Sequence, residues 1–464
     1  MSLEDRLYPL LSAYERLPHP LKVTAGTAYR LLPRRLRFGK SYGEFRHLTQ
    51  EIESWSLEKI ADYQLKQLRA TVIQAGNYCP FYQQRFAGAG IRPEHIHSIN
   101  DLSNLPLLEK RDLIDHLPEM VSSELPESAR LYITTGGSTG VPVGFYLQKG
   151  VSRPKEQAFL EAQWKRAGYF DGARLAVIRG HVTSDKAEGN ISSYDATRNW
   201  LMLSSYHLTE ERLPEYLAAL EKFQPDILHA YPSAALQLAE FLERAGQSWR
   251  VPLKCLLCGS ERLNLPQKRL LERVFNTRVY RWYGHSERVV LAGEGRDSEL
   301  FYFWPAYGFV EFGEPDAEGF REVIGTSFHN FVMPLIRYRT GDYVKLAHPV
   351  TDTRLEFPWP AVADIAGREQ EFLVSRTGRR ISLTAFNMHD QIFDDLYAVQ
   401  FFQEEPGVTE FRYVCGPKFH SARLHYIEEG IRRKLGDDFD FVMREVTETE
   451  KTARGKHRWI VSKL

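Results

Sequence analysis

The chain has little cysteine, no long apolar run and no excess of charge of either sign. Its 464 residues include 4 cysteines, which is too few for a disulfide framework and typical of a reducing compartment. Its 60 lysines and arginines balance 60 acidic residues, so no basic field for nucleic acid is expected. No apolar stretch reaches the ~18 residues of a membrane helix, and residues 1–6 do not resemble a secretion signal. We expect a cytoplasmic protein with no nucleic-acid partner and no membrane span.

Cys255 and Cys258 form a C-x-x-C within the apolar segment 253–258. Such a segment is typical of a buried strand, in which cysteine acts as a small hydrophobic side chain. No second cysteine pair lies at the spacing of a zinc site. We therefore expect a core role for this pair, with a metal or redox role as the alternative.

The pattern of apolar residues changes twice along the chain. Residues 1–125 are expected to form a mostly helical lead-in, with amphipathic spacing over 57–73. From about 130 to 345, short apolar runs alternate with helical stretches, which indicates an α/β core containing parallel sheet. The expected strands and helices are 175–178, 227–230, 253–258 and 279–283, with helices over 234–244 and 265–275. We expect a large domain over 1–366 and a small one over 367–464.

A loop rich in glycine and hydroxyl side chains follows the apolar residues 131–133. It reads T-T-G-G-S-T-G-V-P-V-G over residues 134–144. Glycines let the backbone approach a ligand closely, and hydroxyl groups donate hydrogen bonds to phosphate oxygens. A Walker A loop is excluded, because no lysine follows Gly140 at the required spacing. The loop predicts a polyphosphate site, and an ordinary surface loop is the alternative.

Further polar residues follow strand-like segments. Tyr283-Gly284-His285-Ser286-Glu287 ends one such segment, where ligands of α/β sheets bind. Tyr283 can stack on a purine and Glu287 can hold Mg²⁺; alternatively, Tyr283 packs in the core and Glu287 begins a helix. Gly259-Ser260-Glu261 has the same strand-then-turn form.

Two later residues have both a functional and a structural interpretation. Asp342, in Thr340-Gly341-Asp342, can accept hydrogen bonds from the two hydroxyls of a ribose, or simply make a turn. Lys456 follows Gly455 near the end of the sequence. It can neutralise charge on a phosphate during nucleotidyl transfer, or be an ordinary exposed lysine.

The order of these motifs resembles that of adenylate-forming acyl ligases, and within them the phenylacetate–CoA ligase family. Residues 333–342 are similar to the Met-Pro-Leu-Ile-Arg-Tyr signature of that family, and residues 80–82 and 110–113 to its N-terminal signature. Residues 400–403 and 455–458 are most similar to a branch associated with capsule and surface-polysaccharide gene clusters. The resemblance implies an α/β fold, with an adenylate-forming (acyl-CoA synthetase-like) large N-terminal domain and a small mobile α+β C-terminal domain.

The resemblance also implies roles for particular residues. Glu287 would bind Mg²⁺ and act in catalysis with Lys456, the adenylation lysine. Gln370 stands at the hinge, where the family has an acid or a lysine. The residues implied for ATP binding are Thr135, Gly137, Ser138, Thr139, Gly140, Ser260, Glu261, Tyr283, Gly284, Asp342 and Arg368.

The acid substrate is less defined than the nucleotide. The region 177–194 lacks the Gly/aromatic stretch associated with arylacetate binding, so phenylacetate is not the expected substrate. We expect the pocket for the acid near 179–181, and packing is the alternative role for its residues. The residues expected to line it are His181, Tyr194, Tyr231 and His285.

The resemblance implies a two-step ligase that uses ATP and Mg²⁺. A carboxylic acid is converted into an acyl-adenylate with release of pyrophosphate, and the acyl group then passes to an acceptor. Coenzyme A is the favoured acceptor; a carrier-protein thiol, or a sugar amine or hydroxyl in polysaccharide biosynthesis, is the alternative. A non-catalytic ATP-binding scaffold is a further alternative, and assembly as a homodimer stays open.

Overall fold

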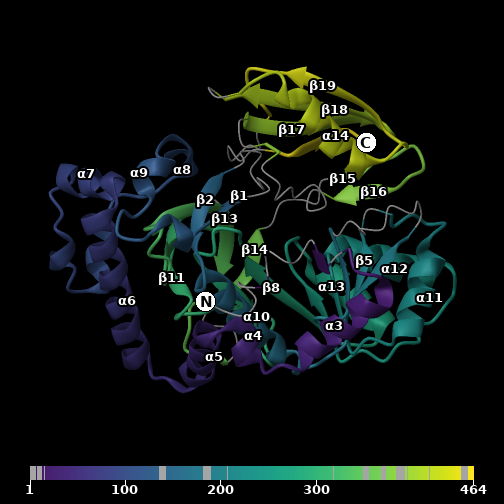
Figure 1. Cartoon of the computed structure of the whole chain (residues 1–464), viewed down its shortest axis with the longest axis horizontal. Helices are drawn as coiled ribbons and strands as arrows, with labels where there is room; N and C mark the ends of the chain where they lie inside the picture. Colours follow the sequence, from purple (N-terminus) through teal and green to yellow (C-terminus); the bar gives the residue numbers. More distant parts are fainter. Residues whose placement is uncertain are drawn as a thin grey trace.

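The computed structural model describes most of the chain (Figure 1). The described residues are 7, 13–14, 16–134, 143–180, 190–205, 207–316, 318–347, 355–366, 372–382, 392–393, 396–416, 419–450 and 458–464. All statements below concern these residues.

Helices dominate the chain up to Met120. The helix expected over 57–73 is confirmed as α6 (Leu57–Tyr78), which begins where the Ser56 Oγ accepts a hydrogen bond from the Lys59 backbone N–H at 3.2 Å. The face of α6 that carries Leu68 and Val72 is buried in the core. The other helices are α3 (His19–Leu31), α4 (Arg34–Phe38), α5 (Lys40–Glu51), α7 (Pro80–Gly88), α8 (Lys110–Asp115) and α9 (Leu117–Met120), with 3₁₀ turns η2 (Ile52–Ser54), η3 (Pro93–His95), η4 (Ile99–Asn104) and η5 (Glu127–Ala129).

The central structure is a 12-stranded sheet in the order β11-β12-β13-β14-β10-β9-β8-β7-β6-β3-β5-β4. Its parallel part confirms the four strands expected from the sequence. The parallel strands are β3 (Leu175–Arg179), β5 (Trp200–Ser204), β6 (Ile227–Ala230), β7 (Cys255–Cys258) and β8 (Val279–Gly284). The remaining strands are antiparallel to their neighbours: β4 (Ser192–Asp195), β9 (Leu291–Glu294), β10 (Phe301–Phe303), β11 (Gly308–Pro315), β12 (Arg321–Ser327), β13 (Tyr338–Leu346) and β14 (Ala361–Ala366).

Helices cover both faces of the parallel part, as an α/β fold requires. On one face, α11 (Leu213–Phe223), α12 (Pro232–Arg244) and α13 (Leu265–Phe275) pack on apolar side chains of β3, β6 and β7. On the other face lies α10 (Ser152–Arg166), whose Trp164 packs on the alternate residues of the same strands. The helices expected over 234–244 and 265–275 are thereby confirmed as α12 and α13, and the predicted α/β class is confirmed.

The cysteine pair lies in the core, as expected. Cys255 and Cys258 are buried in β7, and their side chains belong to the clusters on opposite faces of the sheet. Burial raises the pKa of the Cys255 thiol to about 12 and that of Cys258 further still. Both thiols therefore stay protonated at neutral pH.

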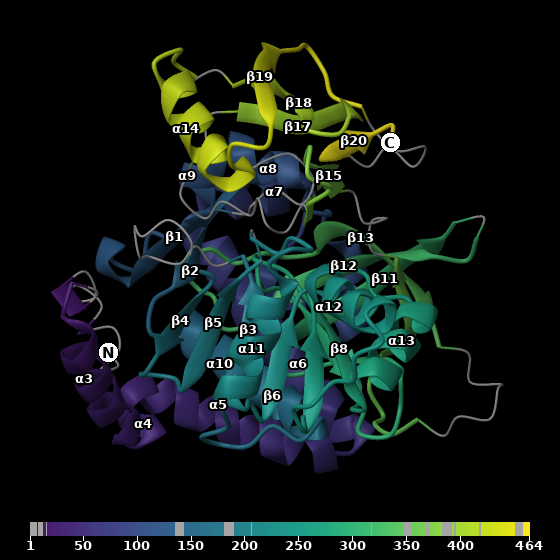
Figure 2. The ribbon, with the colours of Figure 1, turned by 90° about the vertical axis from the view of Figure 1, so that its right-hand side faces the viewer.

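The C-terminal part of the chain has its own sheet and core (Figure 2). The four-stranded sheet has the order β19-β18-β17-β20, and α14 (Arg423–Leu435) packs on it through Ile427 and Ile431. The strands are β17 (Leu396–Glu405), β18 (Val408–Cys415), β19 (Asp440–Glu445) and β20 (Ile460–Ser462), with the short pair β15 (Phe372–Val374) and β16 (Arg380–Ser382) ahead of them. The expected division at residues 366 and 367 stays a prediction.

The hairpin β1 (Arg130–Thr134) and β2 (Gly144–Gln148) forms a separate two-stranded sheet. It pairs Thr134 with Gly144, the two residues at the limits of the predicted phosphate loop. Across the helices that the structure describes, none has the length and apolarity required to cross a bilayer.

Candidate functional site

The carboxyl ends of the parallel strands meet at one edge of the large sheet. Strand β3 lies between β5 and β6, so the connections from β3 and from β6 run in opposite directions. Ligands of open α/β sheets bind at such a switch point, outside the carboxyl ends of the strands. The turns after β6, β7 and β8 carry Tyr231, Ser260 and Glu287. The fold therefore brings the motifs that contain these three residues together at one edge of the sheet.

Tyr283 and Asp342 come from different strands and meet directly. The Tyr283 hydroxyl, at the end of β8, donates a hydrogen bond to Asp342 Oδ2 at 3.0 Å. Burial and the Asp342 carboxylate raise the pKa of Tyr283 well above its usual value, so its phenol remains a donor at neutral pH. The structure thus joins the residue expected to stack on adenine to the one expected to hold the ribose.

Asp342 lies on a bulge of β13 rather than in a free turn. The register between β12 and β13 shifts at Thr340-Gly341-Asp342, and Gly341 has a φ of 70°. The Thr340 hydroxyl accepts a hydrogen bond from the Asp342 backbone N–H at 3.1 Å and donates one to the Val323 carbonyl at 2.8 Å. A bulge bends its strand and redirects a side chain, which here brings the Asp342 carboxylate to Tyr283.

Glu287 is a buried carboxylate, with 5% of its surface exposed. It accepts a hydrogen bond from the Tyr338 hydroxyl at 2.8 Å. Burial acts to raise the pKa of Glu287, but nearby His285 and Lys110 and the hydrogen bonds to the carboxylate outweigh it and hold the pKa below its usual value. Glu287 is therefore ionised at neutral pH.

An ionised carboxylate of this kind fits the predicted magnesium role. Within the described ranges, no group of three or more His, Cys, Asp or Glu side chains could hold a metal without other ligands. Mg²⁺ in nucleotide enzymes is usually bound by one or two carboxylates together with phosphate oxygens. Glu287 matches that donor set, and the remaining ligands would come from the nucleotide and from water.

The turn after β7 is held from both sides. Ser260 has a φ of 71° and accepts a hydrogen bond from Arg179 Nη2 at 2.5 Å. Glu261 accepts hydrogen bonds from the backbone N–H and the hydroxyl of Ser233, at 2.8 and 3.1 Å. A Cβ added to Gly259 would lie 2.4 Å from the Trp282 ring, so only glycine fits there. The Glu261 carboxylate thus anchors the turn to the start of α12.

Two of the residues expected in the acid pocket lie at this edge, and one does not. Tyr231 follows β6. The ring of His285 packs edge-on against that of Tyr283, with 6.1 Å between the ring centres. Tyr194 lies instead at the opposite edge, because β4 runs antiparallel to β5 and pairs Tyr194 with Leu201 near the start of β5. There its hydroxyl donates a hydrogen bond to Asn199 at 2.9 Å.

Several predicted residues lie outside the part of the chain that the structure describes. They are Thr135, Gly137, Ser138, Thr139, Gly140, His181, Arg368, Gln370 and Lys456. Their roles stay predictions.

The sequence interpretation missed two partners within the site. Tyr338 was recognised as part of a signature and not as the residue that donates to Glu287, although that motif position was a usable signal. The bond of Arg179 to Ser260 had no signal in the sequence, because Arg179 ends β3 and Ser260 follows β7, about eighty residues later along the chain.

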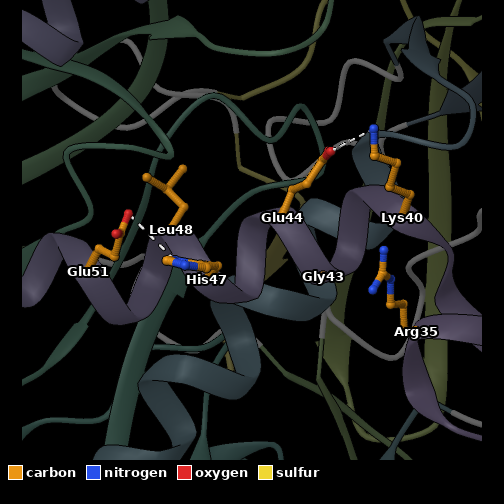
Figure 3. A pocket seen from close by; sticks show the side chains of 7 residues that line it. All are labelled: Arg35, Lys40, Gly43, Glu44, His47, Leu48 and Glu51. Carbon is orange, nitrogen blue, oxygen red and sulfur yellow. Dashed lines mark ion pairs between the residues drawn. The ribbon is translucent and has the colours of Figure 1, made fainter.

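A surface hollow of about 610 Å³ is lined mainly by side chains of α5 (Figure 3). Ion pairs join Lys40 to Glu44 at 3.4 Å and His47 to Glu51 at 3.5 Å along its rim. The lining residues are Arg35, Lys40, Gly43, Glu44, His47, Leu48 and Glu51, and none of them is a predicted site residue.

Comparisons with known proteins agree with the motifs. No protein-family model matches the chain. Protein CapK of Staphylococcus aureus is 23% identical over 375 residues, which cover 79% of this chain and 81% of CapK. The phenylacetate-coenzyme A ligase of Pseudomonas putida is 27% identical over 347 residues, which cover 71% of this chain and 75% of that enzyme. These similarities confirm the resemblance predicted from the order of the motifs.

The fold is similar to that of solved CoA ligases. A crystal structure of 2-hydroxyisobutyryl-CoA ligase in the postadenylation state superposes with a TM-score of 0.57 at 16% identity. The match covers 89% of this chain and 91% of that one. A second structure of that ligase, with 2-HIB-AMP and CoA in the thioesterification state, gives a TM-score of 0.55 at 16% identity, with the same coverage. The predicted adenylate-forming fold is thereby confirmed.

Proposed function

We propose that this protein activates a carboxylic acid with ATP as an acyl-adenylate, releases pyrophosphate, and transfers the acyl group to coenzyme A. The observation that carries the proposal is the meeting of Tyr283 with Asp342 and of Tyr338 with Glu287 at one sheet edge. The similarity to phenylacetate-coenzyme A ligases and the fold of a CoA ligase in its postadenylation state point to the same reaction.

Tyr283 and Asp342 would bind the nucleoside of ATP. The Tyr283 ring offers an aromatic face to adenine, and the Asp342 carboxylate can accept hydrogen bonds from both ribose hydroxyls. The hydrogen bond between them uses one acceptor position of Asp342 and fixes the direction of the others. Gly284, Ser260 and Arg368 would complete the nucleoside site.

The first step forms a bond between a carboxylate oxygen of the acid and the α-phosphorus of ATP. The bond from that phosphorus to the bridging oxygen breaks, and pyrophosphate leaves with the electron pair. By resemblance, the phosphates would be positioned by Thr135, Gly137, Ser138, Thr139 and Gly140. Lys456 would offset the charge that develops on them. When bound, Mg²⁺ would neutralise phosphate charge, and Glu287 is the residue that would hold it.

The second step transfers the acyl group. The sulfur of coenzyme A attacks the carbonyl carbon of the acyl-adenylate, and AMP leaves with the electrons of the carbon–oxygen bond. A carrier-protein thiol and a sugar amine or hydroxyl are the alternative acceptors. Residues 367–464 would form the small domain that brings Lys456 to the site, with Gln370 at the hinge. Assembly as a homodimer and a cytoplasmic location remain predictions.

A panel of carboxylic acids in a pyrophosphate-release assay tests the proposal. We expect release that requires ATP, Mg²⁺ and one class of acid, with AMP formed in equal amount and faster turnover on addition of coenzyme A. Turnover without acceleration by coenzyme A would point to another acceptor. Thermal stabilisation by Mg²⁺–ATP without AMP formation from any acid would refute the proposal and favour the scaffold alternative.

A further inference from the structure

Arg179 places a positive charge at the switch point of the large sheet. It is the last residue of β3, and its guanidinium lies 4.8 Å from the ring centre of Tyr231, the residue after β6. Arg179 is half-buried, so a ligand can reach it, but the charge is only partly exposed to water. It therefore occupies the crevice in which α/β proteins bind ligands.

The described contacts of Arg179 are all with neutral groups. Nη2 donates to Ser260 Oγ at 2.5 Å, and Nη1 lies 3.1 Å from His229 Nε2. Across the described ranges no carboxylate forms an ion pair with it, and the nearby Glu261 is bonded to Ser233. A guanidinium has five N–H donors, so three remain for a ligand. Half-buried positive charge without a counter-charge is unusual unless a ligand supplies it.

Neighbouring donors point to the same kind of ligand. His229 is buried, and burial together with the charge of Arg179 lowers its pKa far below the usual value, so its ring is neutral. Because its Nε2 accepts from Arg179, the proton is on Nδ1, a buried atom without a hydrogen-bond partner in the described structure. The Ser205 hydroxyl is likewise buried and unpaired, and the Ser205 backbone N–H donates to the Arg179 carbonyl at 3.3 Å. Buried donors of this kind normally have a protein or water partner, so their surroundings add polar but uncharged groups beside the guanidinium.

The backbone of Arg179 lies three strands away from that of Tyr283, and its guanidinium borders the nucleoside site at Ser260. Strands β7 and β6 separate β3 from β8, which carries Tyr283. At ~4.8 Å between neighbouring strands, Arg179 is about 14 Å from Tyr283 along the sheet edge. Arg179 lies on the side of the Ser260 turn that faces away from Tyr283, so a group bound by its remaining donors fits the second substrate rather than the adenine.

We propose that Arg179 binds a second carboxylate on the acid that is activated, so that the substrate is a dicarboxylic acid. This inference rests on the proposed function, because it assigns the acid substrate to that reaction. Arginine pairs with carboxylates through two parallel hydrogen bonds, which the free donors of Arg179 allow. The side chain of an arylacetate or a fatty acid would leave the charge of Arg179 without a partner, which disfavours such substrates.

Pairs of acids with the same number of carbons test the inference. Succinate, glutarate and adipate are compared with butyrate, pentanoate and hexanoate in the pyrophosphate-release assay. We expect the wild-type protein to prefer the dicarboxylates. Arg179→Met should lower kcat/KM for the preferred dicarboxylate about 100-fold, mainly through KM. Because Arg179 also holds Ser260, the monocarboxylates should lose some activity as well, but much less than the dicarboxylate. Arg179→Lys keeps the charge and should restore part of the loss.

Arg198→Met is the matched control. Arg198 also lies over an aromatic ring, 5.0 Å from the centre of Trp200, but it precedes β5 and so lies at the opposite edge of the sheet. It should leave acid selectivity unchanged. Thermal unfolding and binding of Mg²⁺–ATP are measured for every variant. If Arg179→Met does not fold, the acid selectivity of the wild type and of Arg179→Lys tests the inference instead.

Two failures can be told apart. Preference of the wild type for monocarboxylates, or an equal loss for both kinds of acid in Arg179→Met, would overturn the inference and leave the proposed function standing. Absence of pyrophosphate release with every acid, in protein that binds Mg²⁺–ATP, would instead refute the proposed function on which the inference rests.

Discussion

Replacing Glu287 by glutamine separates its charge from its structural role. The Glu287 carboxylate is buried and accepts a hydrogen bond from the Tyr338 hydroxyl at 2.8 Å. Glutamine keeps an oxygen that can accept this bond and has nearly the same volume. The change therefore removes one negative charge and leaves the packing in place.

The expected effects on stability and on activity differ in size. A hydrogen bond to a charged group stabilises a fold by about 1.5–3 kcal/mol and a neutral one by about 0.5–1.5 kcal/mol, so Glu287→Gln should lower the free energy of unfolding by about 1 kcal/mol. Loss of a group that stabilises transition-state charge costs roughly 10²–10³ in rate, which is about 2.7–4 kcal/mol. Catalysis should therefore suffer more than stability.

The assay is carboxylate-dependent ATP–pyrophosphate exchange, measured over a range of Mg²⁺ concentrations. We expect Glu287→Gln to reduce exchange by roughly 10²–10³ and to require more Mg²⁺. Glu161→Gln is the matched control, because Glu161 is also buried and accepts a hydrogen bond from a tyrosine, Tyr42, at 2.6 Å. Glu161 lies on α10, away from the strand ends, so its variant should lose stability and keep exchange.

A pH series adds an independent readout for Glu287. The pKa of Glu287 in the folded protein lies below its usual value. Its ionised carboxylate therefore stabilises the fold fully above the unfolded pKa of about 4.3. This stabilisation is lost as the pH falls through the folded pKa. The difference in stability between wild type and Glu287→Gln should narrow below about pH 4.3. Exchange within about threefold of wild type, with unchanged Mg²⁺ dependence, would refute the role of Glu287.

Four further predictions concern other residues. Tyr283→Phe removes the hydroxyl that donates to Asp342 and should raise the KM for ATP about tenfold. Tyr280→Phe is the control, because Tyr280 lies on the same strand β8 and loses only a hydroxyl that donates to the Glu294 carbonyl; equal KM values in the two variants would contradict the nucleoside site. Gly259→Ala should destabilise the protein by about 1–3 kcal/mol in thermal unfolding, because the added Cβ would lie 2.4 Å from Trp282. Gly88→Ala is its control, because a Cβ at that position has no atom within 4 Å. Iodoacetamide at pH 8 should label the native protein at no more than one cysteine, Cys415, because Cys79, Cys255 and Cys258 are buried. Mass spectrometry should find 4 labels after denaturation. Labelling of Cys255 in the native protein would contradict its core role. Lys456→Ala should abolish pyrophosphate exchange while nucleotide binding survives, and unchanged exchange would contradict the assignment. Lys463→Ala, which loses an exposed ion pair with Glu404 and a contact with the Phe402 ring, should keep both exchange and nucleotide binding.

Much of the parallel sheet could be predicted because its signals are local. The apolar runs that became β3, β6, β7 and β8 are bounded by turns, and the helical pattern over 265–275 matches α13. The antiparallel extension was not predicted. Strand β10, for example, pairs with β14 about sixty residues later, and nothing in either segment names the other as its partner.

In the candidate site, too, the individual residues could be predicted from short motifs, but their contacts could not. Tyr283 and Asp342 were each identified from a short motif, but only the bulge in β13 brings their side chains to 3.0 Å. Tyr194 was expected to line the acid pocket together with Tyr231 and His285, with packing as the alternative. The antiparallel direction of β4 carries it instead to the opposite edge of the sheet.

By itself, the sequence determined the α/β class, the strands of the parallel core and the order of motifs that resembles adenylate-forming ligases. These features depend on residue periodicity and on short turn-forming segments, which act between neighbours along the chain. The tertiary structure alone decided that Tyr338 donates to Glu287 and that Arg179 stands at the switch point with no ion-pair partner among the described residues. Such contacts depend on strand order and strand direction, which arise from packing between segments far apart in the sequence.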